Sequence, residues 1–273
     1  MISGTYRYIL LAAIFLPLAE FANAEVIGQP LAPTSTALLT PHSLKIGYAV
    51  DSYSDYFEES PILSLQYGRL TSWGSLSLRI NSADRYQSQD TQYEIDAYPR
   101  LWDGGWAELN MGISSGHLFP HDRQGAEIFS SLGNGYEGSL GVRHLAFTNS
   151  SVTMYTGSLS KYLGNYMFTV RPYVTPSNVG TSVSASIKLT RYFSDADRYV
   201  RVSASTGKSP EERTFPPNIV TLRSHSFGVE GQWSPKKAIF FSPSFSHERQ
   251  ELSFSPGEYV GIDKFSVTMS HRF

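Results

Sequence analysis

The chain has 273 residues, a formal net charge of −2 and no cysteine. The lack of cysteine excludes disulfide bonds and thiolate metal sites, and the small net charge gives no reason to expect nucleic acid as a partner. After the N-terminal region, no segment reaches the roughly 18 consecutive apolar residues that mark a transmembrane helix.

The first 24 residues have the layout of a secretory signal peptide. Arg7 supplies a positive charge, an apolar run covers residues 9–19, and Ala22 and Ala24 form a small-x-small cleavage site. The apolar run is too short for a membrane-spanning helix, which needs about 20 residues. We therefore expect residues 1–24 to be removed and the mature chain to leave the cytoplasm.

The rest of the chain divides into two parts. Residues 25–42 are rich in proline, threonine and serine and lack periodicity, so we expect a short periplasmic lead-in. In residues 43–273, polar and apolar side chains alternate repeatedly, which places the two sets on opposite faces of a strand. Thirteen segments of this kind are found, at 44–51, 62–70, 73–81, 92–97, 106–114, 136–144, 151–160, 166–172, 182–190, 199–205, 226–233, 238–246 and 263–273.

These segments predict an all-β fold, a single antiparallel transmembrane β-barrel in an outer membrane. Their polar sets are dominated by Ser, Thr, Gly and Gln, and their lengths suit strands that cross a membrane. A single-chain bacterial barrel needs an even number of strands. We therefore expect about 12 strands, with 14 as the alternative, and regard 153–160 and 248–259 as doubtful. The long connections 116–135 and 207–219 are expected to be surface loops.

The chain ends on an alternating strand with a terminal aromatic residue. Lipid does not tolerate an open sheet edge, so this last strand must pair with the first. The pattern resembles the C-terminal assembly signal of bacterial outer-membrane barrels. It implies the barrel assembly machinery and outer-membrane lipid as partners in a Gram-negative cell. The predicted signal residues are Phe265, Val267, Met269, His271 and Phe273.

A closer resemblance covers residues 135–211. The phrases "GYEGSLGVRHLAF", "LGNY…RPY" and "RYFSDADRYVRV" resemble the signature run of the YaiO-type outer-membrane β-barrel family. Residues 44–114 resemble the family only in general strand character. The resemblance implies a barrel in the outer membrane, and an association with surface-polysaccharide systems, but no defined biochemical activity. Helical repeats precede the barrel in some family members, and we expect none here, only the short lead-in.

The charged residues on the polar parity are candidates for lining the barrel lumen. Acids and bases are nearly balanced, which argues against a pore that strongly selects one sign of ion. They could form salt bridges that seal the barrel, or line a wet lumen that passes a neutral polymer. The lumen-lining candidates are Arg79, Glu94, Asp96, Glu108, Glu137, Arg143, Arg171, Lys188, Arg201, Glu230 and Lys264.

Four aromatic residues, Tyr98, Trp106, Tyr155 and Tyr199, could provide stacking platforms for sugar rings. The simpler interpretation places them in the aromatic girdles at the two membrane interfaces. A channel or export conduit for a surface polysaccharide is the leading hypothesis, and a possible surface glycan is its expected partner.

Two other functions remain open, an outer-membrane lipid or glycan hydrolase and a sealed barrel that acts as an envelope scaffold. A hydrolase needs a nucleophile and a base on one surface, whereas neighbours in a strand, such as Ser224 and His225 or Ser246 and His247, face opposite ways. A partner on a neighbouring strand cannot be read from the sequence. We therefore assign no catalytic residue and lean against an enzyme.

No metal or cofactor site is predicted. The cluster of His117, His121 and Asp122 lies in an expected loop, and two histidines four residues apart bind a metal only on a helix or a shaped loop. The chain also has no glycine-rich phosphate loop or other cofactor motif.

Overall fold

The structure, a computed structural model, describes residues 41–54, 59–85, 88–148, 150–177, 180–193, 196–214, 217–252 and 255–273. The expected signal peptide, with Ala22 and Ala24, lies outside these ranges, as does almost all of the expected lead-in. Within the described ranges the chain forms 14 strands and no helix that is long and apolar enough to cross a membrane. The expectation of about 12 strands is wrong, and the alternative of 14 is confirmed.

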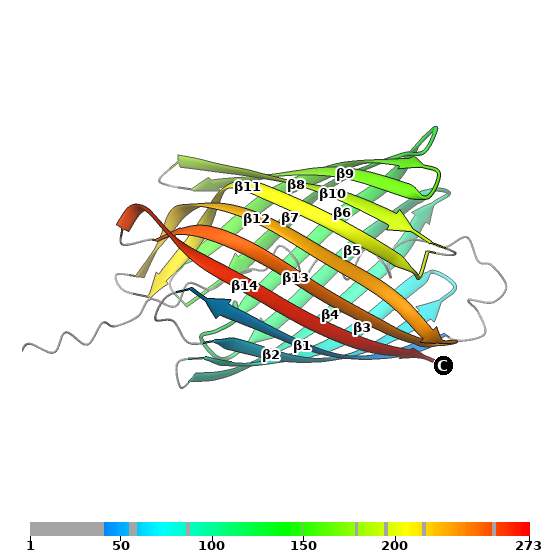
Figure 1. Ribbon diagram of the computed structural model, residues 1–273, viewed down its shortest axis with the longest axis horizontal. Coiled ribbons are helices and arrows are strands. Elements are labelled where there is room, and N and C mark those ends of the chain that lie inside the picture. The colour runs from blue at the N-terminus through cyan, green and yellow to red at the C-terminus, as the bar shows by residue number, and fades with distance from the viewer. Residues whose placement is uncertain are drawn as a thin grey trace, which may run out of the picture.

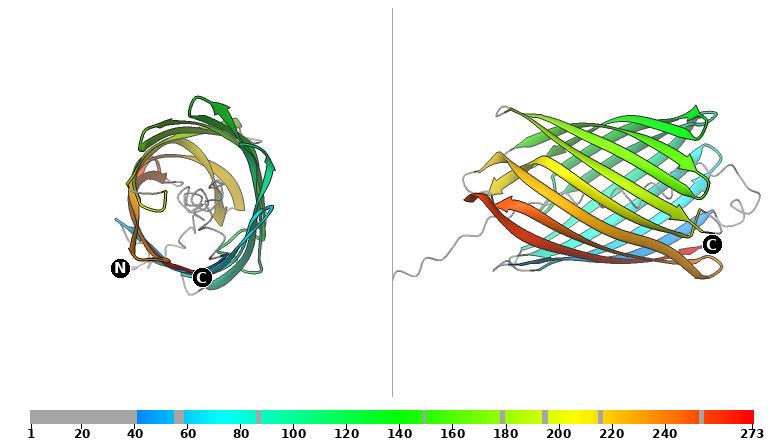
Figure 2. Two further views of the ribbon diagram at one scale, coloured as in Figure 1. Left: turned by 90° about the vertical axis from the view of Figure 1, so that its right-hand side faces the viewer. Right: turned by 45° about the horizontal axis from the view of Figure 1, so that its top comes forward.

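The strands are β1 (His42–Tyr53), β2 (Ser60–Thr71), β3 (Gly74–Arg85), β4 (Ser88–Trp102), β5 (Gly105–Ser114), β6 (Asp122–Gly133), β7 (Tyr136–Ala146), β8 (Ser151–Leu163), β9 (Tyr166–Ser177), β10 (Gly180–Tyr192), β11 (Tyr199–Thr214), β12 (Pro217–Lys236), β13 (Ile239–Leu252) and β14 (Ser255–Arg272). Each strand pairs antiparallel with its neighbours in the chain, and β1 pairs with β14, so the sheet closes into a barrel with tilted strands (Figure 1). The end-on view in Figure 2 shows the closed ring.

The closure between β1 and β14 extends over the length of β1. The register runs from Ser43 opposite Arg272 to Tyr53 opposite Ile262. Where β1 begins and β14 ends, the backbone N–H of His42 donates to the carbonyl of Phe273 at 3.0 Å, and the N–H of Phe273 donates to the carbonyl of His42 at 2.9 Å. Because every strand then has two partners, no open edge is left in the sheet. We call the end that contains His42 and Phe273 the terminal rim, and the opposite end the far rim.

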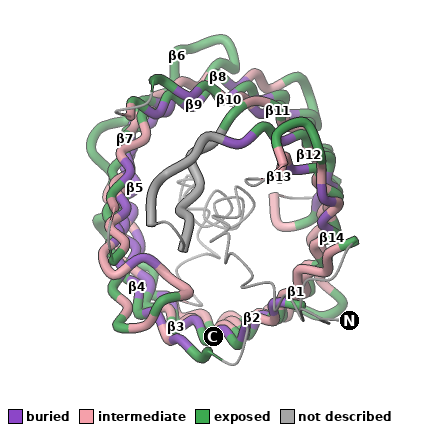
Figure 3. Tube along the Cα trace, turned by 90° about the vertical axis from the view of Figure 1, so that its left-hand side faces the viewer, coloured by how far each residue is buried: buried purple, intermediate pink, exposed green. Residues whose placement is uncertain are grey.

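The two faces of the wall follow the alternation. Large apolar side chains point outward and are exposed, for example Leu63, Ile113 and Leu140, which is 78% exposed. The residues between them point into the barrel, and less exposed positions alternate with more exposed ones along many of the strands, most clearly β4 and β9 (Figure 3). An exposed apolar band with a polar interior is the arrangement of a barrel that spans a membrane. The predicted signal residues of β14 lie on the outward parity, and the ring of Phe273 stacks on that of His42 at 5.7 Å.

The turn between β6 and β7 is an example of the short hairpin turns that join neighbouring antiparallel strands. Asn134 and Gly135 have φ values of 51° and 74°. A two-residue hairpin turn of type I′ needs positive φ at both positions, and asparagine followed by glycine is its preferred sequence.

The two long connections that we expected to be surface loops are mostly strand. Residues 122–133 form β6, and only 115–121 remain as a loop between β5 and β6. Likewise β11 continues to Thr214 and β12 starts at Pro217. The doubtful segments 153–160 and 248–259 also lie in strands, apart from 253–254, which lie outside the described residues. β6 was missed because its inward set includes the bulky Phe129, which breaks the apolar-out, polar-in pattern.

Candidate functional site

The predicted lumen residues all lie on the inward parity of their strands. Glu94, Asp96, Glu108, Arg143, Arg171 and Arg201 are buried, and Arg79, Glu137, Lys188, Glu230 and Lys264 are intermediate. Many of them gather into separate ionic clusters around the wall. Because burial of an unpaired charge is costly, their contacts decide whether the interior is stable.

The first cluster joins β3, β4, β5 and β6. Arg79 Nη2 lies 3.1 Å from both Glu94 Oε2 and Asp96 Oδ2. Arg123 Nη1 lies 3.6 Å from Glu94 Oε1, and the Asn110 amide donates to the Asp96 carboxylate at 2.5 Å. Each carboxylate therefore has both a cation and a neutral donor. Arg123 was not predicted, because it belongs to the missed strand β6.

The second cluster is centred on Glu127 of β6, which was missed for the same reason. Arg171 Nη1 of β9 donates to both of its carboxylate oxygens, at 2.6 and 2.8 Å. Arg143 Nη2 of β7 lies 3.5 Å from Glu127 Oε2, and the Ser139 hydroxyl donates to Oε1. One buried acid therefore contacts arginines from two other strands, and on these contacts the cluster carries one more positive than negative charge.

Two smaller sets of contacts add to the ionic part of the wall. Arg201 donates from Nη1 to Glu230 at 3.0 Å and from Nε to the hydroxyl of Thr190 at 2.8 Å. Lys264 on β14 pairs with Glu248 on β13 at 2.9 Å. Glu108, Glu137 and Lys188 also lie on the inward parity. With acids and bases paired in this way, neither sign of charge dominates the interior.

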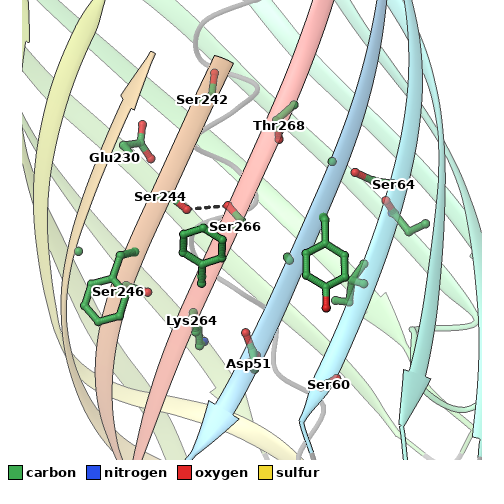
Figure 4. A pocket seen from close by; sticks show the side chains of 18 of the residues that line it. Asp51, Ser60, Ser64, Glu230, Ser242, Ser244, Ser246, Lys264, Ser266 and Thr268 are labelled. Atoms are coloured by element: carbon green, nitrogen blue, oxygen red, sulfur yellow. Dashed lines mark hydrogen bonds between the residues drawn. The ribbon is translucent and has the colours of Figure 1, made fainter. Parts of the chain in front are cut away.

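A different surface covers the lumen side of five neighbouring strands, β2, β1, β14, β13 and β12. It carries small residues and hydroxyl groups, and we call it the serine wall (Figure 4). Within it, the hydroxyls of Ser244 and Ser266 lie 2.6 Å apart across the β13–β14 pair. The wall consists of Gly47, Ser64, Gly228, Ser242, Ser244, Ser246, Ser266 and Thr268.

The serine wall lines a cavity of about 200 Å³ inside the barrel. Arg79, Asn81, Gln92 and Arg123 contribute polar groups to the same cavity, and Leu118, Phe119 and Pro120 contribute apolar surface. A single water molecule needs at least about 10–15 Å³ of such volume, so the cavity is large enough to hold several waters.

The loop of residues 115–121 reaches the cavity because a buried carboxylate holds it. Asp90, at the far-rim end of β4, accepts hydrogen bonds from the backbone N–H groups of Gly116 at 3.1 Å and of Leu118 and Phe119 at 2.9 Å. It also accepts from the hydroxyl of Ser114 at 2.5 Å. A Cβ atom on residue 116 would overlap the carboxylate, so glycine is needed there. We call this arrangement the Asp90 latch.

Three of the four aromatic candidates lie inside the barrel rather than in an interfacial girdle. Tyr98 and Trp106 pack with Phe129 near the terminal rim, and the rings of Trp106 and Phe129 stack at 3.8 Å. Tyr199 is buried, lines the cavity and donates to Glu230. Only Tyr155 of the four is on the outside, 53% exposed. The girdle expectation is therefore wrong for the other three, because they lie on the inward parity.

Among the described residues, no group of three or more His, Cys, Asp or Glu side chains is arranged to hold a metal ion. His117 and His121 lie in the loop of residues 115–121 with their rings 6.3 Å apart, and Asp122 begins β6. His225 points outward to the hydroxyl of Thr206, while Ser224 lies on the inward parity, so these sequence neighbours do not meet.

Comparison with known proteins supports the assignment of the barrel. The sequence matches the family described as YaiO membrane beta barrel domain over residues 41–212. No curated protein matches the chain.

Solved structures with a similar fold are outer-membrane proteins. An outer membrane channel from Pseudomonas putida F1 has a TM-score of 0.52 and 10% identity, with 86% of this chain and 96% of that chain covered. The Acinetobacter baumannii outer membrane protein Omp33 has a TM-score of 0.51 and 10% identity, with 85% and 98% covered. A bacterial polysaccharide outer membrane secretin has a TM-score of 0.49 and 8% identity, with 86% and 99% covered. At these identities the likeness to the first two structures is one of fold alone.

Proposed function

Because the chain belongs to the YaiO membrane β-barrel family and is an outer-membrane β-barrel, we propose that it is a narrow channel or export conduit for a neutral, hydroxyl-rich solute, such as a surface polysaccharide. The observation that supports this most directly is the serine wall beside a cavity that is large enough to hold water. In this proposal the cell is Gram-negative, and its barrel assembly machinery inserts the protein into the outer membrane.

The chemistry of the serine wall suits a sugar. Each serine or threonine hydroxyl can donate one hydrogen bond and accept others, so it can exchange partners with a passing hydroxyl group. The residues are small, which leaves room in front of the wall. An export path also has to release its cargo, and many weak contacts serve that purpose better than a few strong ones.

The ionic clusters support a neutral cargo. A channel that selects an ion needs a ring dominated by one sign of charge. Here Glu94, Asp96 and Glu127 are each paired with arginine at 2.6 to 3.6 Å, so neither sign of charge forms a ring of its own on this part of the wall. The ionic clusters make one part of the wall rigid, and the solute passes along the other part, the serine wall.

The test is single-channel conductance of refolded protein in a planar bilayer, after a heat-dependent gel shift has established folding. We expect small conductance steps with weak ion selectivity, which neutral oligosaccharides reduce more than polyethylene glycol of equal size. Ser266→Leu should lower the conductance because it fills space at the serine wall. Val267→Leu, on the adjacent outward position, is the matched control and should leave it unchanged.

A folded barrel that passes no current would overturn the proposal and favour the sealed envelope scaffold. Strong preference for one sign of ion, with no effect of oligosaccharides, would contradict the neutral cargo.

A further inference from the structure

The outer face of the barrel changes character at one level near the far rim. On β1, β14 and β13 the outward residues Val50, Phe265 and Phe245 lie opposite one another across the strands. The next outward residues on β14 and β13 are Asp263 and His247. The apolar band therefore ends here, at the level where the acyl chains of a bilayer give way to polar headgroups.

Asp263 and His247 form an exposed pair at this boundary. Their side chains are 58% and 50% exposed, and His247 Nδ1 lies 2.8 Å from Asp263 Oδ1. A carboxylate accepts hydrogen bonds, so Nδ1 carries the proton and donates it. Nε2 of the neutral ring is then an acceptor, which is the tautomer that a general base requires.

A serine next to a third strand lies close to this pair. It is Ser54, which directly follows β1, and its backbone N–H donates to the carbonyl of Gly261 on β14 at 2.9 Å. The N–H of Gly261 donates to the Ser54 hydroxyl at 3.0 Å, which fixes the position of Oγ. A Cβ atom on residue 261 would lie 3.4 Å from Ser54 Oγ and 3.5 Å from His247 Cε1. The hydroxyl and the imidazole therefore border one small gap, which is open because residue 261 is glycine.

We propose that Ser54, His247 and Asp263 form an acyl-ester hydrolase site on the outside of the barrel, facing esters at the membrane surface. Asp263 comes from β14, His247 from the flanking strand β13, and Ser54 directly follows β1, the strand on the other side of β14. Because these residues are far apart in the sequence, alternation alone does not bring them together. A nucleophile, a base and a carboxylate that orients the base form the constellation of serine hydrolases on unrelated folds. Contacts between nucleophile and base are often long before substrate binds.

The reaction needs only water as a second reactant. Ser54 Oγ bonds to the ester carbonyl carbon while His247 Nε2 takes the hydroxyl proton. The bond between that carbon and the alcohol oxygen breaks, and the leaving alcohol takes the proton from His247. A water molecule then gives a proton to His247 and attacks the acyl-serine, and the carboxylic acid leaves as Ser54 regains its proton. Asp263 holds the ring and stabilises its charged form.

The test uses the full chain refolded in vesicles of phosphatidylethanolamine and phosphatidylglycerol, with fatty-acid release as the readout. A soluble short-chain p-nitrophenyl ester and a fluorophosphonate probe are used in parallel. Ser54→Ala and His247→Gln should each reduce turnover by roughly a hundredfold or more, and Asp263→Asn should also reduce it. Ser82→Ala, at an exposed outward serine on β3, is the matched control and should keep both turnover and probe labelling.

The two substrates distinguish the source of the ester. Cleavage of vesicle lipid that depends on Ser54 supports the site and identifies lipid as substrate. Cleavage of the soluble ester alone, also dependent on Ser54, supports the site and identifies a water-soluble ester. No turnover of either ester by folded wild-type protein, or equal turnover by Ser54→Ala, overturns the proposal. Channel conductance should be the same in all these variants, because the residues lie outside the lumen.

Discussion

Removing the carboxylate of Asp90 should release the loop of residues 115–121 from the lumen. In Asp90→Ala the three backbone N–H groups and the Ser114 hydroxyl lose their shared acceptor. A hydrogen bond to a charged group contributes about 1.5–3 kcal/mol, but these bonds share one acceptor and water can replace part of them. We take about 3 kcal/mol as the net effect, which lowers the ratio of latched to released loop roughly a hundredfold.

The assay is single-channel recording, because Leu118, Phe119 and Pro120 of the loop line the cavity. We expect Asp90→Ala to conduct more current or to switch between two levels, with a native heat-dependent gel shift. Gly116→Val should have the same effect, since its side chain would overlap the Asp90 carboxylate. Asp84→Ala is the control, because the Asp84 carboxylate accepts from the exposed Gln89.

A folded Asp90→Ala variant with one unchanged conductance level would refute this reasoning. It would mean that the loop keeps its position without the latch, or that the narrowest part of the lumen lies elsewhere.

Three further predictions concern the wall itself. Glu127→Ala removes the acid that both Arg143 and Arg171 contact, so we expect a loss of up to about 3–5 kcal/mol, measured as a lower urea midpoint of the gel shift. The reversal potential should also move toward anion preference, and an unchanged midpoint would contradict the pairing. Leu140→Arg, on the lipid face near the middle of β7, should cost about 2–4 kcal/mol in vesicles. Phe273→Ser should impair assembly, because the closing contacts with His42 are weakened, and normal amounts of heat-modifiable barrel in the outer membrane would argue against a signal role.

Much of the fold could be predicted from the sequence because alternation is a local property. It identified thirteen of the strands, the all-β class, the closure and the outer-membrane location. It failed at β6, where Phe129 points inward and Gln124 points outward, so the apolar set is split between the two faces. An aromatic residue does not by itself tell which side of a barrel it occupies. Trp106 and Phe129 are stable inside the barrel because their stacked rings bury each other's apolar surface.

The candidate sites were harder to predict from the sequence, because alternation tells which face of a strand a residue lies on but not which residues it contacts. Arg79 and Glu94 are directly opposite on β3 and β4, which requires the register to be known. Arg171 reaches Glu127 from three strands away, and no spacing in the sequence indicates that contact. The lumen roles of the charged residues and the assembly role of the last strand stay predictions. The serine that borders His247 was hidden because Ser54 lies 193 residues before it in the chain.

The seam between β1 and β14 also bears on how the barrel folds. Every other strand pair joins neighbours in the chain, whereas this pair joins segments more than 200 residues apart, such as Ser43 and Arg272. Loop-closure entropy rises by about 0.6 kcal/mol for each doubling of the loop, so closing the seam costs roughly 2–3 kcal/mol more than closing a hairpin of about 15 residues. Contacts this distant in sequence slow folding. The hairpins should therefore form first, as a curved open sheet, and the rate of assembly should depend on when its two edges meet.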